Sequence, residues 1–367
     1  KILKTQYYIK QCNIEFIDTG FIFNNISFTD INNNKGNIDG IITHHHLKNW
    51  GVDLHIKANN LLALNTGYKD NNLFYGKAYG SGNISIKTED KITWIIANMK
   101  TEKQSNITIN MDWNTTVREN KYIIFEKEYQ EELKADSLLP IQINKSKLAL
   151  SLNITATPDA FVRVDLDPSI GGTLKGTGSG TLRLDLTPED KFEIYGTYVL
   201  ENGNFELNLG NILARNFNLT KGGTVTWNGK PSEGIVAVKA NYPTRVSIAN
   251  LFSENENMNT YRPIPINSLL YLNGNILNPE FNFGIELLDV DENIKTLVYN
   301  AIDTTDREKM VRQTFSVLLM GKFESRSINT STVNAGLGYS LSELASHHLN
   351  KWMSSITDKV NLGFSYR

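Results

Sequence analysis

Two runs of histidine are the first candidates for a metal site. His44, His45 and His46 are consecutive, and His347 and His348 form a second run. Neighbouring residues of a strand point to opposite faces, and neighbours on a helix also diverge, so neither run converges on one ion. No Asp or Glu stands at ligand spacing from either run. We therefore expect surface or turn histidines and no bound metal.

Acidic residues raise a second possibility, a pair of carboxylates for acid–base catalysis. Asp165, Asp167 and Asp185 occupy the polar positions of alternating segments that also carry Arg and Lys. A solvated sheet face explains this pattern better than a catalytic pair. Cys12 has no histidine near it in the sequence, so we do not expect it to act as a nucleophile.

A group of glycines superficially resembles a phosphate-binding loop. Gly171 and Gly172 are followed by Gly176, Gly178 and Gly180. A phosphate loop requires a Lys-Ser/Thr pair or a helix start after the glycines, and neither follows here. We interpret these residues as turn and edge glycines. The sequence therefore indicates no catalytic constellation, and we expect neither enzyme activity nor a cofactor.

The elements around these residues are strands. Residues 171–248 alternate apolar and polar side chains, and a period of two gives each strand one apolar face and one wet face. Turn-forming residues at 187–190, 201–204 and 228–231 predict hairpins. We expect a long antiparallel sheet with one continuous apolar face. The residues expected to line it are Val162, Val164, Leu166, Leu182, Leu184, Leu186, Phe192, Ile194, Phe205, Leu207, Leu209, Val225, Trp227, Val236, Val238, Val246 and Ile248.

The rest of the chain divides by its pattern into further segments. Short alternating runs fill residues 1–117, and a charged segment at 118–147 is expected to cross from one section of sheet to the next. Alternation resumes over 148–288. The pattern changes to a helical period over 289–356, and 357–367 starts another strand. Trp94, Trp113, Trp227 and Trp352 are expected to be core residues.

Capping signals predict two or three amphipathic helices in the segment 289–356. The N-cap and N3 pairs are Asp289 with Glu292, Thr305 with Glu308, and Ser340 with Glu343. Gly321 is expected to end the second helix. The third helix has an apolar stripe that includes Leu341, Leu344, Leu349, Trp352 and Met353. This stripe either closes the end of the apolar face or contacts a membrane or a partner.

Composition excludes some classes of partner. The net charge is −2, and charged residues lie on the strand face opposite the aromatic ones, so we expect no nucleic-acid binding. The single cysteine allows no internal disulfide, which fits a reducing compartment or a bacterial envelope protein. The chain begins without Met, and we expect it to be a fragment of a longer protein. No segment reaches the ~20 apolar residues that span a bilayer as a helix.

The second half of the chain resembles the C-terminal region of TamB-family translocation and assembly proteins, which are AsmA-like envelope proteins. The matching segments are LENGNFEL at 200–207, FNLTKGGTVTWNG at 217–229, the strand from Pro231 through Ala240, YLNGNI at 271–276 with Asn278-Pro279, and the closing helices. Residues 1–160 match AsmA-like strands in texture, as at 51–64. The family's N-terminal membrane anchor and its usual final strand are not found in the chain.

The resemblance implies a specific fold and function. It implies a sheet curled lengthwise into an open half-pipe (a β-taco) with an apolar interior, in which 1–117 is an AsmA-like groove segment and 148–288 a TamB-like one. It also implies a periplasmic protein of Gram-negative bacteria that is anchored in the inner membrane and reaches the outer membrane. Such a bridge conducts phospholipids between the two membranes and acts with an Omp85-type outer-membrane barrel protein (TamA-like).

Two other functions fit the same periodicity. An apolar sheet face is often sealed by a second sheet or a solenoid core, which would make the protein a non-enzymatic scaffold or adhesin of the envelope. A transmembrane barrel also alternates, but the capped helices and the polar residues 250–263 weigh against it.

Overall fold

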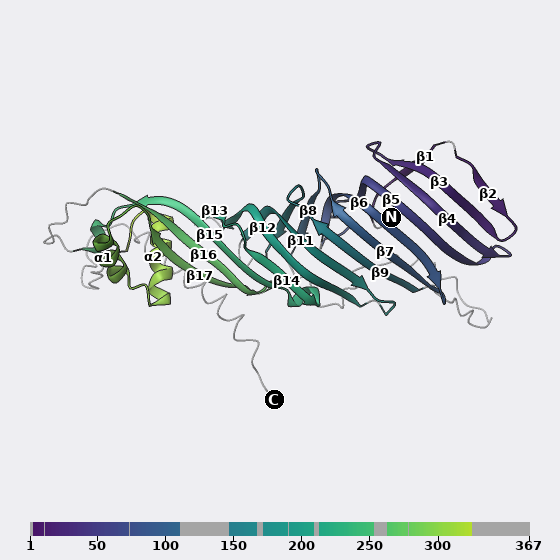
Figure 1. Ribbon diagram of the computed structural model, residues 1–367. Coiled ribbons are helices and arrows are strands. Elements are labelled where there is room, and N and C mark those ends of the chain that lie inside the picture. The colour runs from purple at the N-terminus through teal and green to yellow at the C-terminus, as the bar shows by residue number, and fades with distance from the viewer. Residues whose placement is uncertain are drawn as a thin grey trace, which may run out of the picture.

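The described part of the chain folds into one long β-sheet with two α-helices at its C-terminal end (Figure 1). The computed structural model describes residues 3–10, 12–72, 74–110, 147–166, 172–189, 191–208, 213–252, 263–277 and 279–324. Within this part of the chain, 17 strands form a single hydrogen-bonded sheet. The expected mostly-β class, with helices late in the chain, is confirmed.

The elements have the following bounds. The strands are β1 (Tyr7–Ile9), β2 (Ile14–Ile17), β3 (Gly20–Asp30), β4 (Lys35–His45), β5 (Lys48–Thr66), β6 (Phe74–Glu89), β7 (Ile92–Thr101), β8 (Asn106–Asn110), β9 (Lys147–Ala156), β10 (Phe161–Asp165), β11 (Gly172–Leu186), β12 (Phe192–Asn208), β13 (Ala214–Leu219), β14 (Thr224–Gly229), β15 (Ile235–Val246), β16 (Ile264–Asn275) and β17 (Glu280–Leu287). The helices are α1 (Glu292–Ile302) and α2 (Arg307–Met320), and two short 3-10 turns are η1 (Pro231–Glu233) and η2 (Ala249–Leu251).

Long strands of the sheet have pairs of short strands beside them, placed end to end. β7 and β8 both pair with β6, β9 and β10 with β11, and β13 and β14 with β12. Neighbours are antiparallel except for β7–β9 and β8–β10, which are parallel. Parallel neighbours need a crossover connection. The expected crossing segment, 118–147, lies outside the described residues except for Lys147, the first residue of β9, so the segment boundaries stay predictions.

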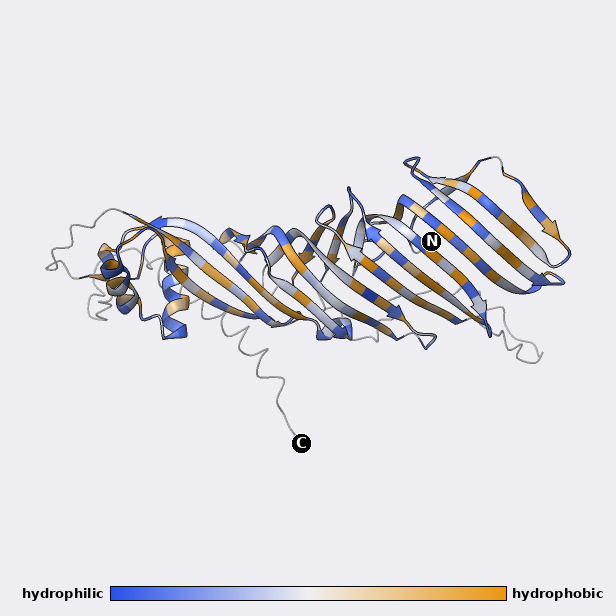
Figure 2. Cartoon of the chain, in the orientation of Figure 1, coloured by the Kyte–Doolittle hydropathy of each residue, from blue (hydrophilic) through white to orange (hydrophobic). Residues whose placement is uncertain are grey.

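The strand register brings the apolar positions to one face, which we call the apolar face. In β11 and β12, Leu184 lies opposite Ile194, and Leu174 lies opposite Phe205. Residues directly opposite each other in a sheet share a face, and the same pairing continues through Val238 and Leu272 of β15 and β16. Figure 2 shows the resulting alternation of apolar and polar residues along the strands.

Interruptions of neighbouring strands line up across the middle of the sheet, and we call this line the crease. β5 shifts register twice between residues 58 and 64, and β11–β12 shifts between Thr177 and Gly178. Residues 102–105, 157–160 and 220–223 separate the paired short strands at the same level. The Phe161 N–H donates to the Ser105 carbonyl at 2.9 Å, and the Gly222 N–H donates to the Leu200 carbonyl at 2.8 Å, which joins these breaks. Bulges bend and twist a strand, so the crease explains why the sheet curls.

The buried carboxylate of Asp30 fixes one end of the crease. Asp30 is 2% exposed and accepts hydrogen bonds from the backbone N–H groups of Leu62 at 2.9 Å and of Asn32 at 2.8 Å. Leu62 lies inside the bulged part of β5. Burial alone would raise the pKa of Asp30, but the hydrogen bonds from Asn34, Leu62 and Asn32 together lower it below its usual range. The ionised carboxylate therefore holds the β3–β4 turn against the β5 bulge.

Two sequence-based interpretations are wrong at the crease. Residues 201–204 form no hairpin, because they continue β12 through the register shift. Gly176, Gly178 and Gly180 are not turn or edge glycines, because they lie inside β11 between β9–β10 and β12. A Cβ atom at Gly178 would stand 2.4 Å from the Val199 carbonyl oxygen. The backbones of β11 and β12 are therefore so close at this point that only glycine fits. The expected hairpin at 187–190 does join β11 to β12.

The two helices begin one or two residues later than expected. Asp291 is the N-cap of α1, and Asp306 is the N-cap of α2 and accepts from the N–H groups of Glu308 and Lys309. The expected caps, Asp289 and Thr305, precede them. Gly321 ends α2 in the left-handed conformation (φ 67°) with its N–H on the Val317 carbonyl, as predicted. The third helix and the strand at 357–367 lie outside the described residues.

We expect Gly178→Ala to destabilise the fold by about 2 kcal/mol, because the added methyl group has no space against the β12 backbone. Urea unfolding measures this change. Gly284→Ala in β17 is the matched control, since its nearest neighbour would stand at an ordinary 3.6 Å. Equal losses in both variants would contradict the close approach at the crease.

Candidate functional site

The apolar face is the largest feature of the molecule that carries a uniform chemistry. Its expected residues in β10, β11 and β12 are paired across the strands: Val164 lies opposite Leu174, and Leu186 opposite Phe192. In β14 and β15, Val225 lies opposite Val236. Trp227 lies opposite Gly196, and its indole N–H donates to the Pro231 carbonyl at 3.2 Å. Leu209 lies outside the described residues.

Burial divides the apolar face into a covered part and an uncovered part. Phe205, Leu207, Val246 and Ile248 are at most 1% exposed and belong to the covered part. Leu182, Leu184, Ile194 and the expected residues of β10 are only partly buried. Among the described elements, nothing outside the sheet except α1, α2 and two 3-10 turns is available as a second layer.

Helices α1 and α2 form the cover at the C-terminal end, where Figure 1 shows them beside β15–β17. Val311, Phe315 and Leu318 of α2 pack into one cluster with apolar residues of β12–β17. Val298 and Ile302 of α1 pack with Val246, Ile266 and Ile285, among others, in a second cluster. The rings of Phe283 and Phe315 meet edge to face with centroids 5.2 Å apart. Burying these side chains stabilises the cover by an amount on the order of 2 kcal/mol each.

The apolar face also extends through the N-terminal half of the chain. Ile56 lies opposite Ile84, Ile84 opposite Ala97, and Ala97 opposite Leu152, which in turn lies opposite Leu184. The sequence predicts alternation of apolar and polar residues in these strands, but the residues expected to line the apolar face did not include theirs. The prediction that Trp94 is a core residue is wrong. Trp94 lies on the other face opposite Lys87 and is 40% exposed, because Ile95 occupies the apolar phase of β7.

Polar residues such as Tyr198, Arg215 and Ser268 interrupt the apolar face near the crease and the cover. Tyr198 lies opposite Val225, its hydroxyl is buried without a hydrogen-bond partner in the described part of the chain, and burial raises its pKa to about 12. Arg215 lies opposite Leu207 and donates from Nη2 to the Leu318 carbonyl at 2.6 Å. Arg215 was not among the residues expected from the sequence, although the alternation of Leu213, Arg215 and Phe217 already places an arginine in the apolar phase.

The opposite face carries the charged residues in short ion pairs. Arg183 contacts Asp185 at 3.0 Å, Arg163 contacts Asp165 at 2.9 Å, and Lys191 pairs with Glu193. The hydrogen bond from Lys191 lowers the pKa of Glu193, which keeps that carboxylate ionised. Asp165 and Asp185 thus act as ion-pair partners on a wet face. Asp167 lies outside the described residues.

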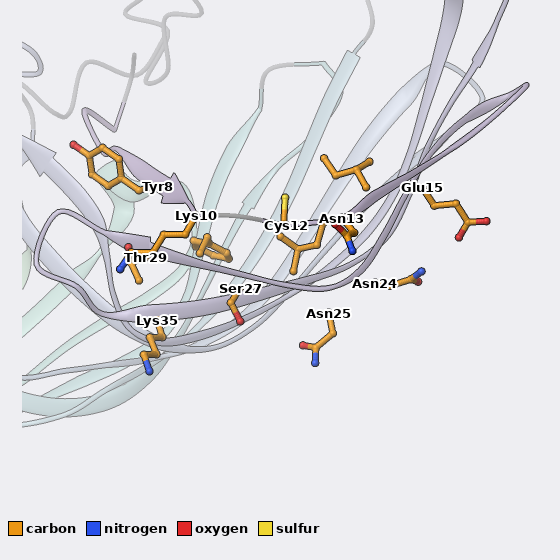
Figure 3. A pocket seen from close by; sticks show the side chains of 13 residues that line it. Tyr8, Lys10, Cys12, Asn13, Glu15, Asn24, Asn25, Ser27, Thr29 and Lys35 are labelled. Atoms are coloured by element: carbon orange, nitrogen blue, oxygen red, sulfur yellow. The ribbon is translucent and has the colours of Figure 1, made fainter.

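The remaining candidates for chemistry lie apart from one another. His44 packs on Trp50 with ring centroids 5.0 Å apart, and His45 and His46 meet each other at the β4–β5 turn. The described residues contain no group of three His, Cys, Asp or Glu side chains placed to hold a metal. Cys12 is exposed and borders a cavity of about 720 Å³ with Lys10 and Asn25 (Figure 3). No described helix is long and apolar enough to cross a membrane.

We expect Tyr198→Phe to keep or raise the free energy of unfolding, by up to about 1 kcal/mol, because it removes a buried hydroxyl that has no partner. Urea unfolding measures the change. Tyr195→Phe on the opposite face is the control, since its hydroxyl donates to Glu193 at 2.9 Å and its loss gives no gain. A loss of stability in the Tyr198 variant alone would show that the hydroxyl has a partner in the folded protein.

Comparison with known proteins gives one clear match. A family model described as the TamB C-terminal domain matches residues 24–367, nearly the whole chain and well beyond the half in which the sequence segments were recognised. No curated protein matches the chain.

Proposed function

The chain belongs to the TamB C-terminal domain family, and from this membership and its uncovered apolar face we propose that it conducts phospholipids along the sheet between the inner and outer membranes. The family is a translocation and assembly module of the cell envelope, and it is non-enzymatic. The single observation that carries the proposal is the continuity of the apolar face from β4 through β17, with ion pairs confined to the other side.

The physical argument concerns the acyl chains. Each CH₂ group exposed to water costs about 0.8 kcal/mol, so two ordinary acyl chains oppose an aqueous crossing by roughly 20 kcal/mol. A sheet that the crease curls into a half-pipe would hold the chains against residues such as Leu184 and Leu152. The open side would leave the headgroup in water. The lining needs no reactive group, only an apolar surface that continues from strand to strand and on which a lipid can slide.

The cellular location and the partner of the protein are part of the same proposal. We place the protein in the periplasm, anchored in the inner membrane by a part of the protein outside this chain, and we name an Omp85-type barrel as its outer-membrane partner. Family membership supports an association with outer-membrane assembly. The apolar stripe at Leu349 and Trp352 lies outside the described residues, and we retain it as the candidate contact with the barrel or the membrane.

A sealed scaffold is the second candidate function, and one observation favours it. α1 and α2 bury the apolar face at the C-terminal end as completely as an ordinary core, with Leu270 and Ile266 at 0% exposure. If other parts of the protein cover the rest of the face in the same way, the molecule is a structural element of the envelope. The partial exposure of Leu182 and Leu184 supports the lipid route instead.

We expect Leu184→Asp to block lipid transport, because it places a charge in the path of the acyl chains. The variant is expected to fold, because Leu184 is partly exposed and a polar group is tolerated there. The measurement is phospholipid transfer between the membranes of cells that carry the variant in the full-length protein. Arg183→Asp is the matched control, one residue away on the opposite face. Leu207 is unsuitable for this test because it is buried under α2.

In-cell photocrosslinking from position 184 tests the proposal directly. A photoreactive residue at Leu184 is expected to give phospholipid adducts in mass spectrometry, and one at Arg183 is expected to give none. Protein adducts alone at both positions would show a sealed core and would support the scaffold.

A further inference from the structure

Arg215 places a cation on the apolar face where its covered part begins. Among the described strand residues of β6–β17, Arg215 is the one residue of the apolar phase with an ionised side chain. Its neighbours in that phase are Leu207 across the strand pair and Phe217 two residues along, both at most 1% exposed. Arg215 itself is half-buried, and withdrawing part of a charged group from water is costly unless an anion or several hydrogen bonds compensate it.

The compensation of Arg215 is incomplete in the described part of the chain. Nη1 donates to the Ala214 carbonyl at 3.0 Å, Nη2 donates to the Leu318 carbonyl at 2.6 Å, and the guanidinium stands 5.9 Å from the centre of the Tyr242 ring. Nε is buried and has no partner there. A guanidinium has five N–H donors, so carbonyl oxygens satisfy only part of it. No described carboxylate lies within ion-pair distance of it.

Arg215 borders a cleft whose other charges cancel. The cleft has a volume of about 600 Å³ and is also bordered by Leu166, Leu207, Asp165 and Glu206. Asp165 is held by Arg163 at 2.9 Å, and Glu206 is held by Lys175 at 2.6 Å. These two ion pairs leave Arg215 as the uncompensated charge of the cleft. The cleft spans both phases of the strands, with Glu206 on the polar one, and Leu166 is its partly buried apolar contact beside the cluster that includes α2. Arg215 is the positive group of the cleft that lacks an anion among the described residues.

The geometry points to Arg215 as a binding site for the phosphodiester of a phospholipid, at the point where the uncovered apolar face meets α2. Guanidinium and phosphate form strong charge-assisted hydrogen bonds. The phosphate competes with the Leu318 carbonyl for the guanidinium. Headgroup binding would therefore weaken the hydrogen bond that holds the last turn of α2 against the sheet. The inference rests on the proposed function, since it requires acyl chains on the apolar face.

The test is displacement of a fluorescent acyl probe from the purified chain by two short-chain lipids. Dihexanoylphosphatidylglycerol carries the phosphodiester, and dihexanoylglycerol has the same chains without it. We expect the wild-type chain to prefer the phosphate-bearing lipid by about tenfold, and we expect Arg215→Gln to lose that preference. Arg183→Gln is the matched control, because Arg183 also stacks on a tyrosine, at 4.6 Å from the Tyr195 ring, but on the opposite face.

A second variant keeps the test decisive if Arg215→Gln does not fold. Arg215→Lys keeps a positive charge at this half-buried position but lacks the paired donors of the guanidinium, so we expect the preference for the phosphate-bearing lipid to fall to about threefold. An unchanged preference in Arg215→Lys, or the full preference in a folded Arg215→Gln, would overturn the phosphate site. Equally strong binding of inorganic phosphate alone would also overturn it, because the ligand would then be a free anion. Displacement by neither lipid would instead refute the proposed lipid route.

Discussion

The phase of side-chain alternation is the constraint on which the rest of this molecule depends. A strand that slips by one residue sends every side chain to the other face, and a sheet of 17 strands multiplies that risk. In β12 the apolar residues change from even positions, such as Ile194, to odd positions, such as Phe205. The register shift near residue 201 absorbs the extra residue and keeps both on the same face. β3 solves the same problem with a shift between Phe23 and Ile26.

These shifts also give the sheet its shape. Because the bulges of successive strands stand side by side, the bends add up along one line instead of scattering over the surface. The breaks at 102–105, 157–160 and 220–223 extend that line, and Asp30 anchors it with a buried, ionised carboxylate. The same feature thus keeps the apolar face continuous and curls it, which are the two properties that a route for acyl chains requires.

The two ends of the apolar face differ in chemistry. At the C-terminal end, α1 and α2 turn it into an ordinary core, and Arg215 marks the border with a hydrogen bond to the last turn of α2. Toward β4, much of the same face is only partly buried, and Phe28, Ala58 and Leu61 form a small buried cluster of their own on it. A lipid that moves along the sheet would therefore meet a transition from open surface to packed core. Beside that transition, a lipid headgroup and the Leu318 carbonyl at the end of α2 would compete for the guanidinium of Arg215.

The sequence by itself determined which residues can share a face, because alternation with a period of two is a local property. The shared face of Leu184 and Ile194 and the placement of the charged residues in the polar phase both follow from it. The helix stop at Gly321 follows from a separate local property, the ease with which glycine adopts the left-handed conformation. Whether residues 201–204 turn or continue depended on the neighbouring strands, since Gly and Asn serve hairpins and bulges equally well. The phase of Trp94 was ambiguous locally because Ile95 beside it is equally apolar. Only the tertiary structure decided that α2 covers Leu207 and leaves Leu184 partly exposed, because burial depends on contacts between segments that are distant in the chain.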